Sequence, residues 1–270
     1  GCGCGACYQV CPKQCISMQP DKKGFLYPVI DQTECIHCHL CEKVCPEDPT
    51  VRAKGTGQPE LFGAVHREQQ VLMQSASGGA FPAIVQSFCD EDSVIFGVQY
   101  DENMRVCHSY VIGKDAIGKF KKSKYVQSDT GKTFRQAKEF LEQGKKVLFT
   151  GTPCQISGLK AFLRKDYENL LTVDLICHGV ASPALFADYI ALIEKKYHKK
   201  VVWADMRTKE KVRGNWVLMN LSTALEDSSV RFHPLSTAFL GIYLKNIGYR
   251  DACFSCPFYQ IPRVSDFTIG

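Results

Sequence analysis

Cysteine spacing constrains this chain more tightly than any other feature of its sequence. Between Glu34 and Pro46 the chain reads ECIHCHLCEKVCP, four cysteines separated by two, two and three residues. Three cysteines at this spacing wrap one 4Fe-4S cube through a tight loop, while a fourth before proline points to a neighbouring cube. Zinc is the alternative, but structural zinc usually takes two separated CxxC pairs. The run therefore predicts iron-sulfur binding by Cys35, Cys38, Cys41 and Cys45.

A second run, CGCGACYQVCP, opens the chain and is incomplete when it is placed at the same spacing. Its first ligand would fall at position 1, which is Gly1. Three explanations stay open: the natural chain carries a cysteine there, Cys2 substitutes for it, or the site holds an incomplete cluster. The other cysteines of this run are Cys4, Cys7 and Cys11.

Two such runs predict two clusters whose ligands cross over between the runs. One cluster would take Cys35, Cys38, Cys41 and Cys11. The other would take Cys4, Cys7, Cys45 and the unsettled fourth ligand. Cys15 lies in the apolar surroundings of these sites, and we expect it to pack there rather than to bind iron.

Composition favours a reducing, cytoplasmic setting for these thiols. A disulfide scaffold is the alternative for a cysteine-rich chain, but nine of the 15 cysteines precede residue 46 at metal-ligand spacing, many of them too close to pair. The net charge of +5 is spread along the chain, so we expect no nucleic-acid partner. No apolar run approaches the roughly 20 residues of a membrane span, and no signal-peptide pattern is present.

Three segments differ in character along the chain. Residues 1–50 hold the two cysteine runs, joined by a predicted hairpin whose turn is Asp21 to Gly24. Residues 51–60 are rich in proline, glycine and charge and are interpreted as a linker. Residues 61–270 form the second domain. Because the sequence starts without Met and ends within a motif, SDFTIG, we expect it to be a piece of a longer protein.

The second domain alternates predicted strands and helices, which is typical of α/β proteins with parallel strand pairs. We therefore predict an α+β ferredoxin-like N-terminal domain followed by an α/β domain with a partly parallel sheet. The predicted strands cover 93–100, 108–113, 145–151 and 170–179. The predicted helices cover 81–89, 133–144, 155–165 and 184–197, the last opened by Ser182 and Pro183.

Later cysteines follow the strands of this domain. In VLFTGTPCQISGL, Cys154 lies at the start of a helix, where the helix dipole favours a thiolate. Cys177 and His178 follow the next strand, and parallel neighbours bring both cysteines to the sheet edge where α/β folds bind ligands. Cys253 and Cys256 form a later CxxC. The four cysteines predict a third cluster; the alternative is two core cysteines and an unrelated CxxC.

Other candidates carry weaker signals. The turn SASGGAF before a helix suits a phosphate, although a simple helix cap explains it as well. His178 is either a proton donor or a structural histidine. The basic segment 121–129 is either a phosphate site or a solvated charge run. Cys89 and Cys107 are interpreted as ordinary helix and strand residues.

These motifs together resemble a known family. SASGGAF, KSKYVQS, GTPCQISGL, DLICHGVASP, MRTK followed by GNW, CFSC and SDFTIG occur in this order. The chain resembles the beta subunit of coenzyme F420 hydrogenases and dehydrogenases, preceded by a two-cluster ferredoxin domain. The resemblance implies FAD and at least one 4Fe-4S cluster in the second domain, with Cys154, Cys177, Cys253 and Cys256 as ligands. The FAD contacts that it implies are Ser77, Gly78, Gly79, Lys124, Tyr125, Ser128, Gly151 and Thr152.

The functional hypothesis is an iron-sulfur flavoprotein oxidoreductase. It would pass electrons between the clusters and FAD, to or from a hydride acceptor that is coenzyme F420 or another substrate. A redox partner protein or a small molecule would exchange the electrons, and the sequence singles out no catalytic residue. The main alternative is a non-catalytic ferredoxin-type subunit that serves a partner enzyme. A third interpretation is a zinc-bearing interaction module.

Overall fold

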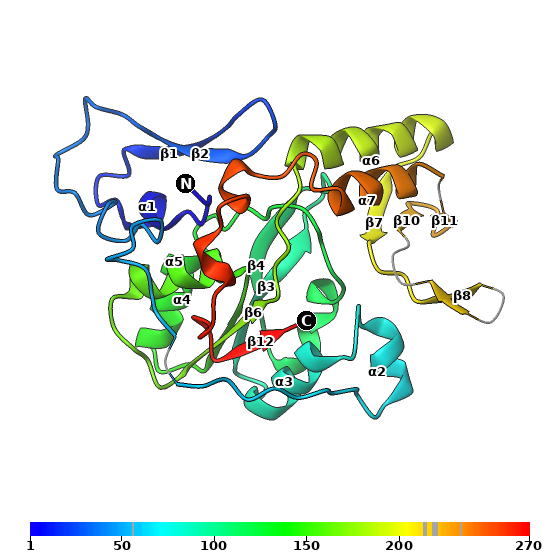
Figure 1. The fold of residues 1–270 in the computed structure, drawn as a ribbon, viewed down its shortest axis with the longest axis horizontal. Coiled ribbons are helices and arrows are strands. Elements are labelled where there is room, and N and C mark those ends of the chain that lie inside the picture. Colours follow the sequence, from blue (N-terminus) through cyan, green and yellow to red (C-terminus); the bar gives the residue numbers. More distant parts are fainter. Residues whose placement is uncertain (56, 213–214, 218–220, 233) are drawn as a thin grey trace.

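The computed structural model describes all residues except 56, 213–214, 218–220 and 233 (Figure 1). The helices are α1 (Ala6–Val10), α2 (Gln69–Gln74), α3 (Ala80–Phe88), α4 (Thr133–Glu142), α5 (Pro153–Leu163), α6 (Pro183–Tyr197) and α7 (Pro234–Leu244), with 3-10 turns η1 (Lys114–Phe120), η2 (Asp251–Cys253) and η3 (Pro257–Tyr259). The strands are β1 (Ile16–Pro20), β2 (Leu26–Ile30), β3 (Val94–Tyr100), β4 (Val106–Ile112), β5 (Val147–Thr150), β6 (Leu170–Leu175), β7 (Val201–Asp205), β8 (Glu210–Val212), β9 (Asn215–Val217), β10 (Ser222–Leu225), β11 (Val230–Phe232) and β12 (Phe267–Ile269).

A five-stranded sheet in the order β12-β6-β5-β3-β4 forms the centre of the second domain (Figure 1). The pairs β12/β6, β6/β5 and β5/β3 are parallel, and β4 joins the edge antiparallel to β3. This confirms the predicted mixed α/β fold with a partly parallel sheet. Because β5 and β6 are parallel neighbours, the segments that follow them emerge at the same edge of the sheet.

Each face of this sheet is covered by helices, as the strand sequences require. In β3, Val94 and Phe96 pack on one face with α4 and α5, while Ile95 packs on the other with α3 and η1. Side chains alternate between the faces of a strand, so an all-apolar strand such as VLF in β5 is buried on both sides. The sheet is therefore the inner layer of three.

A second core lies beside the sheet, between α6, α7 and a small antiparallel sheet in the order β11-β10-β7. Its apolar side chains include Phe186 and Ile193 of α6 and Leu240 of α7. Ser182 caps α6 by accepting a hydrogen bond from Leu185 N at 3.0 Å, with Pro183 in the first turn. This start agrees with the sequence prediction.

The two cysteine runs of residues 1–50 do not form equal structures. The first contains helix α1, whereas residues 40–44 of the second form only turns. Between the runs, β1 and β2 pair antiparallel with Ile16 opposite Ile30, so the predicted hairpin is confirmed. The more specific prediction of a ferredoxin-like fold for this segment is not confirmed.

The N-terminal segment packs directly on the second domain, above α4 and α5 (Figure 1). Gln127 donates its side-chain N–H to Cys2 O at 2.9 Å, and Thr130 donates its hydroxyl to Cys4 O at 2.9 Å. From the segment itself, Gln9 accepts a hydrogen bond from Phe134 N at the start of α4. These buried polar contacts fix the first cysteine run against the sheet domain, because an unpaired buried donor or acceptor costs free energy.

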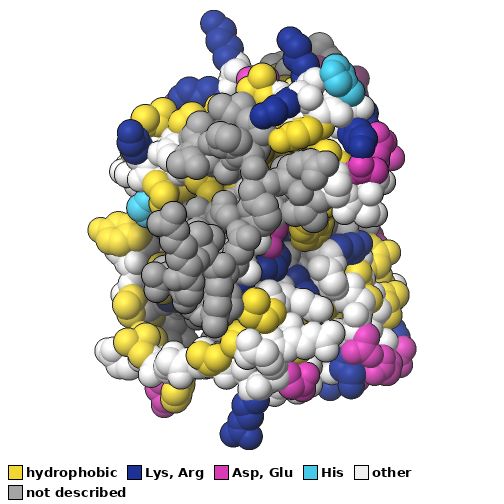
Figure 2. All heavy atoms as spheres, turned by 90° about the vertical axis from the view of Figure 1, so that its right-hand side faces the viewer, with side chains coloured by type: hydrophobic (Ala, Val, Ile, Leu, Met, Phe, Trp, Pro, Cys, Tyr) yellow, Lys and Arg dark blue, Asp and Glu magenta, His cyan; other side chains and the backbone are white. Residues whose placement is uncertain are grey.

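The surface carries scattered charge. On the face of Figure 2, Lys and Arg side chains lie among Asp, Glu and hydrophobic side chains over the part drawn in colour. Within the described parts of the chain, no helix has the length and apolar character needed to span a bilayer.

Candidate iron-sulfur and cofactor site

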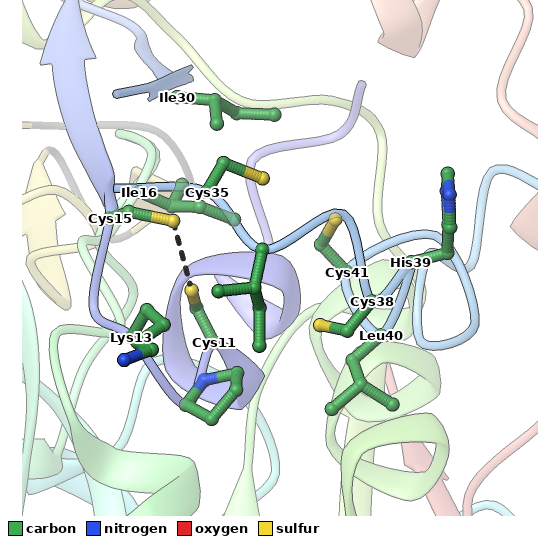
Figure 3. A pocket seen from close by; sticks show the side chains of 12 residues that line it. Cys11, Lys13, Cys15, Ile16, Ile30, Cys35, Cys38, His39, Leu40 and Cys41 are labelled. Carbon is green, nitrogen blue, oxygen red and sulfur yellow. Dashed lines mark hydrogen bonds between the residues drawn. The ribbon is translucent and has the colours of Figure 1, made fainter. Parts of the chain in front are cut away.

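One pocket gathers the cysteines of both runs (Figure 3). Cys11 from the first run, and Cys35, Cys38 and Cys41 from the second, line this pocket, and these four are the predicted ligands of one cluster. Cys15 also lines it, with its sulfur 3.4 Å from the sulfur of Cys11. A fifth thiol, that of Cys15, therefore lines the pocket beside the four predicted ligands, although the sequence predicted only a packing role for it.

A second group of thiols lies in the same N-terminal segment. Burial raises the pKa of Cys7 to about 11, and the thiols of Cys45 and Cys41 lie close enough to add to the rise. Cys4 is in turn an electrostatic neighbour of Cys7. The structure thus brings Cys4, Cys7 and Cys45 together. Cys2 is the candidate for the fourth ligand.

Cys2 faces the second domain. It packs in the same apolar cluster as Cys4 and Cys154, and its thiol interacts with both of theirs. Those two neighbours lower the pKa of Cys2, whereas the Cys2 thiol and burial raise the pKa of Cys154. Burial and the neighbouring thiol thus act against the helix dipole at Cys154. No pattern in the sequence indicates that Cys2 and Cys154 meet.

The remaining cysteines of the second domain lie around the same point. Burial raises the pKa of Cys177 to about 11, with Cys253 and Cys256 near enough to contribute. Cys154 has Cys177 among its electrostatic neighbours, and Cys253 has Cys2 among its own. The four predicted cysteines from three separate segments are thus neighbours in space, and Cys2 joins them from the N-terminal segment.

The chemistry of the donor set fits iron-sulfur clusters. All of these side chains are free thiols, and thiolate is the ligand that iron-sulfur clusters take. Among the residues that the structure describes, no three Cys, His, Asp or Glu side chains converge closely enough to hold a single metal ion. In a cluster the ligand sulfurs surround an inorganic core instead of one ion, so wider spacing is expected of its ligands.

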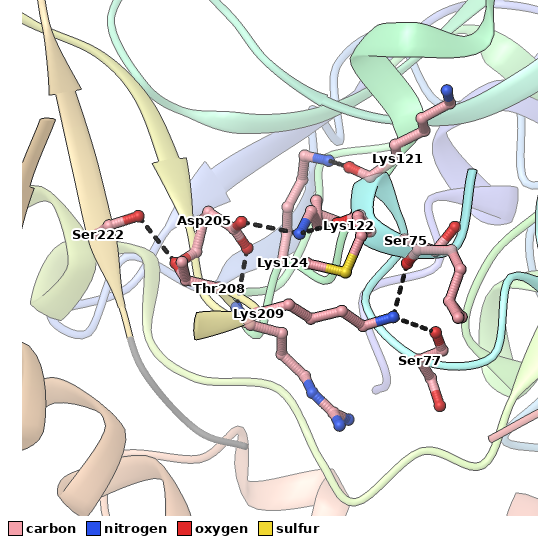
Figure 4. Close-up of polar contacts among 12 residues, drawn as sticks. Ser75, Ser77, Lys121, Lys122, Lys124, Asp205, Thr208, Lys209 and Ser222 are labelled. Carbon is pink, nitrogen blue, oxygen red and sulfur yellow. Dashed lines mark hydrogen bonds and ion pairs between the residues drawn. The ribbon is translucent and has the colours of Figure 1, made fainter. Parts of the chain in front are cut away.

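Cationic side chains converge beside the glycine-rich turn (Figure 4). Lys209 donates to Leu72 O and Ser77 O, both at 2.6 Å. Its pKa is lowered by burial and by the charges of Lys122 and Arg207. Within this group Lys122 is paired with Asp205 at 3.0 Å, while Arg207 Nε is buried with no hydrogen-bond partner among the described residues. The group carries excess positive charge.

Lys124 and Tyr125, two of the predicted FAD contacts, border this cationic group. The Lys124 ammonium lies 5.4 Å from the ring centre of Tyr100 and 5.2 Å from that of Trp203. Burial lowers the pKa of Lys124 to about 7. The Tyr125 hydroxyl is 3.5 Å from Arg207 Nη1. The sequence pattern assigns no role to the segment Asp205 to Trp216, of which Arg213 and Gly214 lie outside the described residues.

The two glycines of the turn have a packing reason of their own. A Cβ at Gly78 would lie 2.3 Å from Ala64 O, and one at Gly79 would lie 2.8 Å from His66 Cβ. Gly79 also has a φ of +86°, which side chains disfavour. Close approach of residues 64–66 therefore explains both glycines without a ligand.

The other predicted FAD contacts lie at the start of α5. Gln155 donates to Ser128 Oγ at 3.0 Å and accepts from Thr152 N at 3.0 Å, which completes the cap of this helix. Gly151 lies beside Gln155, and the Thr152 hydroxyl is 3.2 Å from Cys154 Sγ. Ser128, Gly151 and Thr152 are thus grouped around Gln155 and Cys154 at the start of α5.

Three further residues have local surroundings that agree with structural roles. The His178 ring lies edge-on to Tyr249, with ring centres 6.0 Å apart. Cys89 is buried at the end of α3, and Cys107 lies within β4.

Comparison with protein families matches both parts of the chain. Residues 144–270 match the family that describes the C terminus of the coenzyme F420 hydrogenase/dehydrogenase beta subunit. Residues 2–48 match the 4Fe-4S dicluster domain. Residues 2–48 are thus similar to a 4Fe-4S dicluster domain, and residues 144–270 are similar to the C-terminal part of this beta-subunit family. The resemblance noted from the motifs is confirmed, and the chain is an iron-sulfur protein related to the beta subunit.

A solved structure of the F420-reducing [NiFe] hydrogenase complex from Methanosarcina barkeri contains a similar chain. Its sequence identity is 16%, and the match covers 78% of this chain and 72% of that chain with a TM-score of 0.44. The comparison with curated proteins finds no match.

Proposed function

We propose that this protein passes electrons from two N-terminal 4Fe-4S clusters through a third cluster to a bound FAD. The observation that carries the proposal is the meeting of Cys2 and Cys154. It joins the cysteines of the N-terminal segment to those of the sheet domain without intervening protein layers. Electron transfer between clusters requires this kind of close approach, and the chain supplies it by packing the segment on α5.

The ligand sets of the proposal follow the grouping of the thiols. Cys11, Cys35, Cys38 and Cys41 would hold one cluster around the pocket of Figure 3. Cys4, Cys7 and Cys45 would contribute to a second, whose fourth ligand is open. Cys154, Cys177, Cys253 and Cys256 would hold the third. In this view residues 1–50 act as the ferredoxin-type domain, 51–60 as linker and 61–270 as the flavin-binding domain.

The cationic group beside the glycine-rich turn supports an anionic ligand such as the diphosphate of FAD. Lys122, Arg207 and Lys209 bring three positive charges against the single carboxylate of Asp205, and Arg207 Nε has an unused buried N–H among the described residues. Guanidinium and ammonium groups in such an arrangement bind phosphate oxygens well. Ser77, Gly78, Gly79, Lys124 and Tyr125 would line the ligand on this side.

When bound, FAD exchanges single electrons with clusters and hydride with a substrate. The protein's part is to hold the ligand, to set the potentials of the clusters and to exclude water. The hydride acceptor would be coenzyme F420 or another substrate, and a redox partner protein would supply or accept the electrons. We propose a cytoplasmic location because thiols of this kind persist in reducing surroundings.

The alternative function is that of a carrier without flavin. The packing of residues 64–66 alone explains why positions 78 and 79 are glycine. These two glycines therefore do not require a bound flavin, which favours the carrier. In that case the chain would only relay electrons to a partner enzyme.

Anaerobic purification followed by iron, sulfide and flavin analysis distinguishes the two. The proposal expects about twelve irons per chain, from three four-iron clusters, and one FAD released on denaturation. About eight irons and no flavin would favour the carrier. Zinc without acid-labile sulfide would refute both and favour an interaction module.

A further inference from the structure

Arg250 lies between the N-terminal segment and the cysteines of the sheet domain, and its charge has no carboxylate partner among the described residues. It is only 1% exposed. Its guanidinium donates to Gly1 O at 2.8 Å, Leu26 O at 2.9 Å and Gln127 Oε1 at 2.8 Å. All three acceptors are neutral. The nearest acid in the sequence, Asp251, is paired instead with exposed Lys23.

A buried cation without a counter-charge is costly, so its presence calls for an anion. The contacts around Arg250 indicate where that anion lies. Cys253 N donates to Arg250 O at 2.9 Å, and the charged group of Arg250 is an electrostatic neighbour of the Cys253 side chain. On the other side, Gln127 links Arg250 to Cys2 O. The guanidinium therefore has both Cys2 and Cys253 among its neighbours.

Two details show that this place is built for the guanidinium. Its carbon lies 4.0 Å from the ring centre of Tyr27, so the hairpin covers it with an aromatic face. A Cβ at Gly3 would lie 2.9 Å from Arg250 Nη1 and 2.7 Å from Gln127 Nε2. The left-handed Gly3, with φ of +75°, lets the first cysteine run pass close over Arg250.

We propose that Arg250 is the fixed counter-charge of the third cluster and raises its reduction potential. This inference rests on the proposed function, because it requires a cluster at Cys154, Cys177, Cys253 and Cys256. Four thiolates and an iron-sulfur core carry net negative charge, and uptake of one electron adds another unit. A buried positive charge nearby stabilises the reduced form more than the oxidised form. Arg250 thus acts on the cluster through its fixed charge, and the higher reduction potential makes the third cluster accept electrons more readily.

The test is potentiometric titration of the anaerobic full-length chain, followed by electron paramagnetic resonance. The signal of the third cluster is identified as the one that Cys154→Ser removes. Arg250→Met removes the charge and should lower the potential of that signal by at least 59 mV, which is a tenfold change for one electron. Arg250→Lys keeps the charge and should shift it by less than half as much.

Arg135→Met is the matched control. Arg135 also binds carbonyls of the N-terminal segment, those of Gln9 and Cys11, but from α4. This variant should leave the reduction potential of the third cluster unchanged. Equal shifts in Arg250→Met and Arg250→Lys, a shift in Arg135→Met that matches that of Arg250→Met, or no shift in Arg250→Met would each overturn the inference.

A second variant decides the question if Arg250→Met loses the third cluster. Gln127→Glu places a carboxylate 2.8 Å from Arg250 Nη1 and neutralises the guanidinium without removing it. It should lower the same potential, and an unchanged potential would overturn the inference. Wild-type protein without a signal that depends on Cys154 would instead refute the proposed function, so the two failures are distinct.

Discussion

Gly158→Ala is the most informative single substitution in the contact between the two domains. Gly158 lies on α5 one turn after Cys154, and a Cβ there would lie 2.7 Å from Cys4 Sγ and 2.9 Å from Cys4 Cβ. Alanine gains about 1 kcal/mol of helix propensity. Overpacking a buried contact costs about 1 to 3 kcal/mol, and a backbone-anchored Cβ cannot turn aside as a flexible side chain can. We expect a net loss of up to about 2 kcal/mol.

Gly241→Ala is the matched control, because Gly241 lies in α7 and a Cβ there would meet nothing within 4 Å. This variant should gain about 1 kcal/mol. The two variants should therefore differ by about 1 to 3 kcal/mol, or about 2 to 12 °C in the melting temperature of anaerobically prepared protein. Gly158→Ala should also lose iron from the N-terminal segment as Cys4 is displaced. Equal melting temperatures with equal iron contents would refute the packing of Cys4 on α5.

Three further predictions concern a histidine, a lysine and a cysteine. Burial lowers the pKa of His108 to about 4, so between its ordinary value of 6.5 and 4 the unfolded chain binds a proton that the folded chain does not. This difference should lower the free energy of unfolding, measured with urea, by about 2 kcal/mol from pH 7 to pH 5. His108→Gln should remove this loss, and identical pH profiles of the unfolding free energy in the wild type and the variant would contradict the prediction. Lys209→Ala should weaken FAD binding about tenfold or more in a fluorescence titration without loss of iron. The control Lys138→Ala, on the surface of α4, should leave FAD binding unchanged. Equal FAD affinities of the two variants would argue against the cationic group as the FAD site. Cys15→Ala should keep the iron content of the wild type, and a loss of about four irons would make Cys15 a ligand.

Much of the fold was predictable because its signals are local. The alternation of strands and helices, the Ser182–Pro183 start of α6 and the turn at Asp21 to Gly24 each depend on neighbouring residues. The cysteine spacing grouped Cys11 with Cys35, Cys38 and Cys41 as ligands of one cluster; the four line one pocket, and their binding of a cluster stays a prediction. These predictions required no knowledge of how distant segments pack.

The contacts between distant segments could not be predicted in this way. The meeting of Cys2 with Cys154 and the buried place of Arg250 depend on how residues 1–30 pack on the sheet domain. A lone arginine after a tyrosine carries no signal of burial. Likewise, Lys209 reaches Ser77 across more than a hundred residues of chain, and only the fold brings them together.

The most direct test of the electron path is the number of unpaired spins per chain in the fully reduced protein and the magnetic coupling between them. With three 4Fe-4S clusters in contact through Cys2 and Cys154, dithionite-reduced protein should give about three spins per chain by electron paramagnetic resonance, with signals broadened by mutual coupling. Cys154→Ser should remove about one spin and most of the coupling. Two unbroadened spins in the wild type, unaffected by Cys154→Ser, would contradict the account.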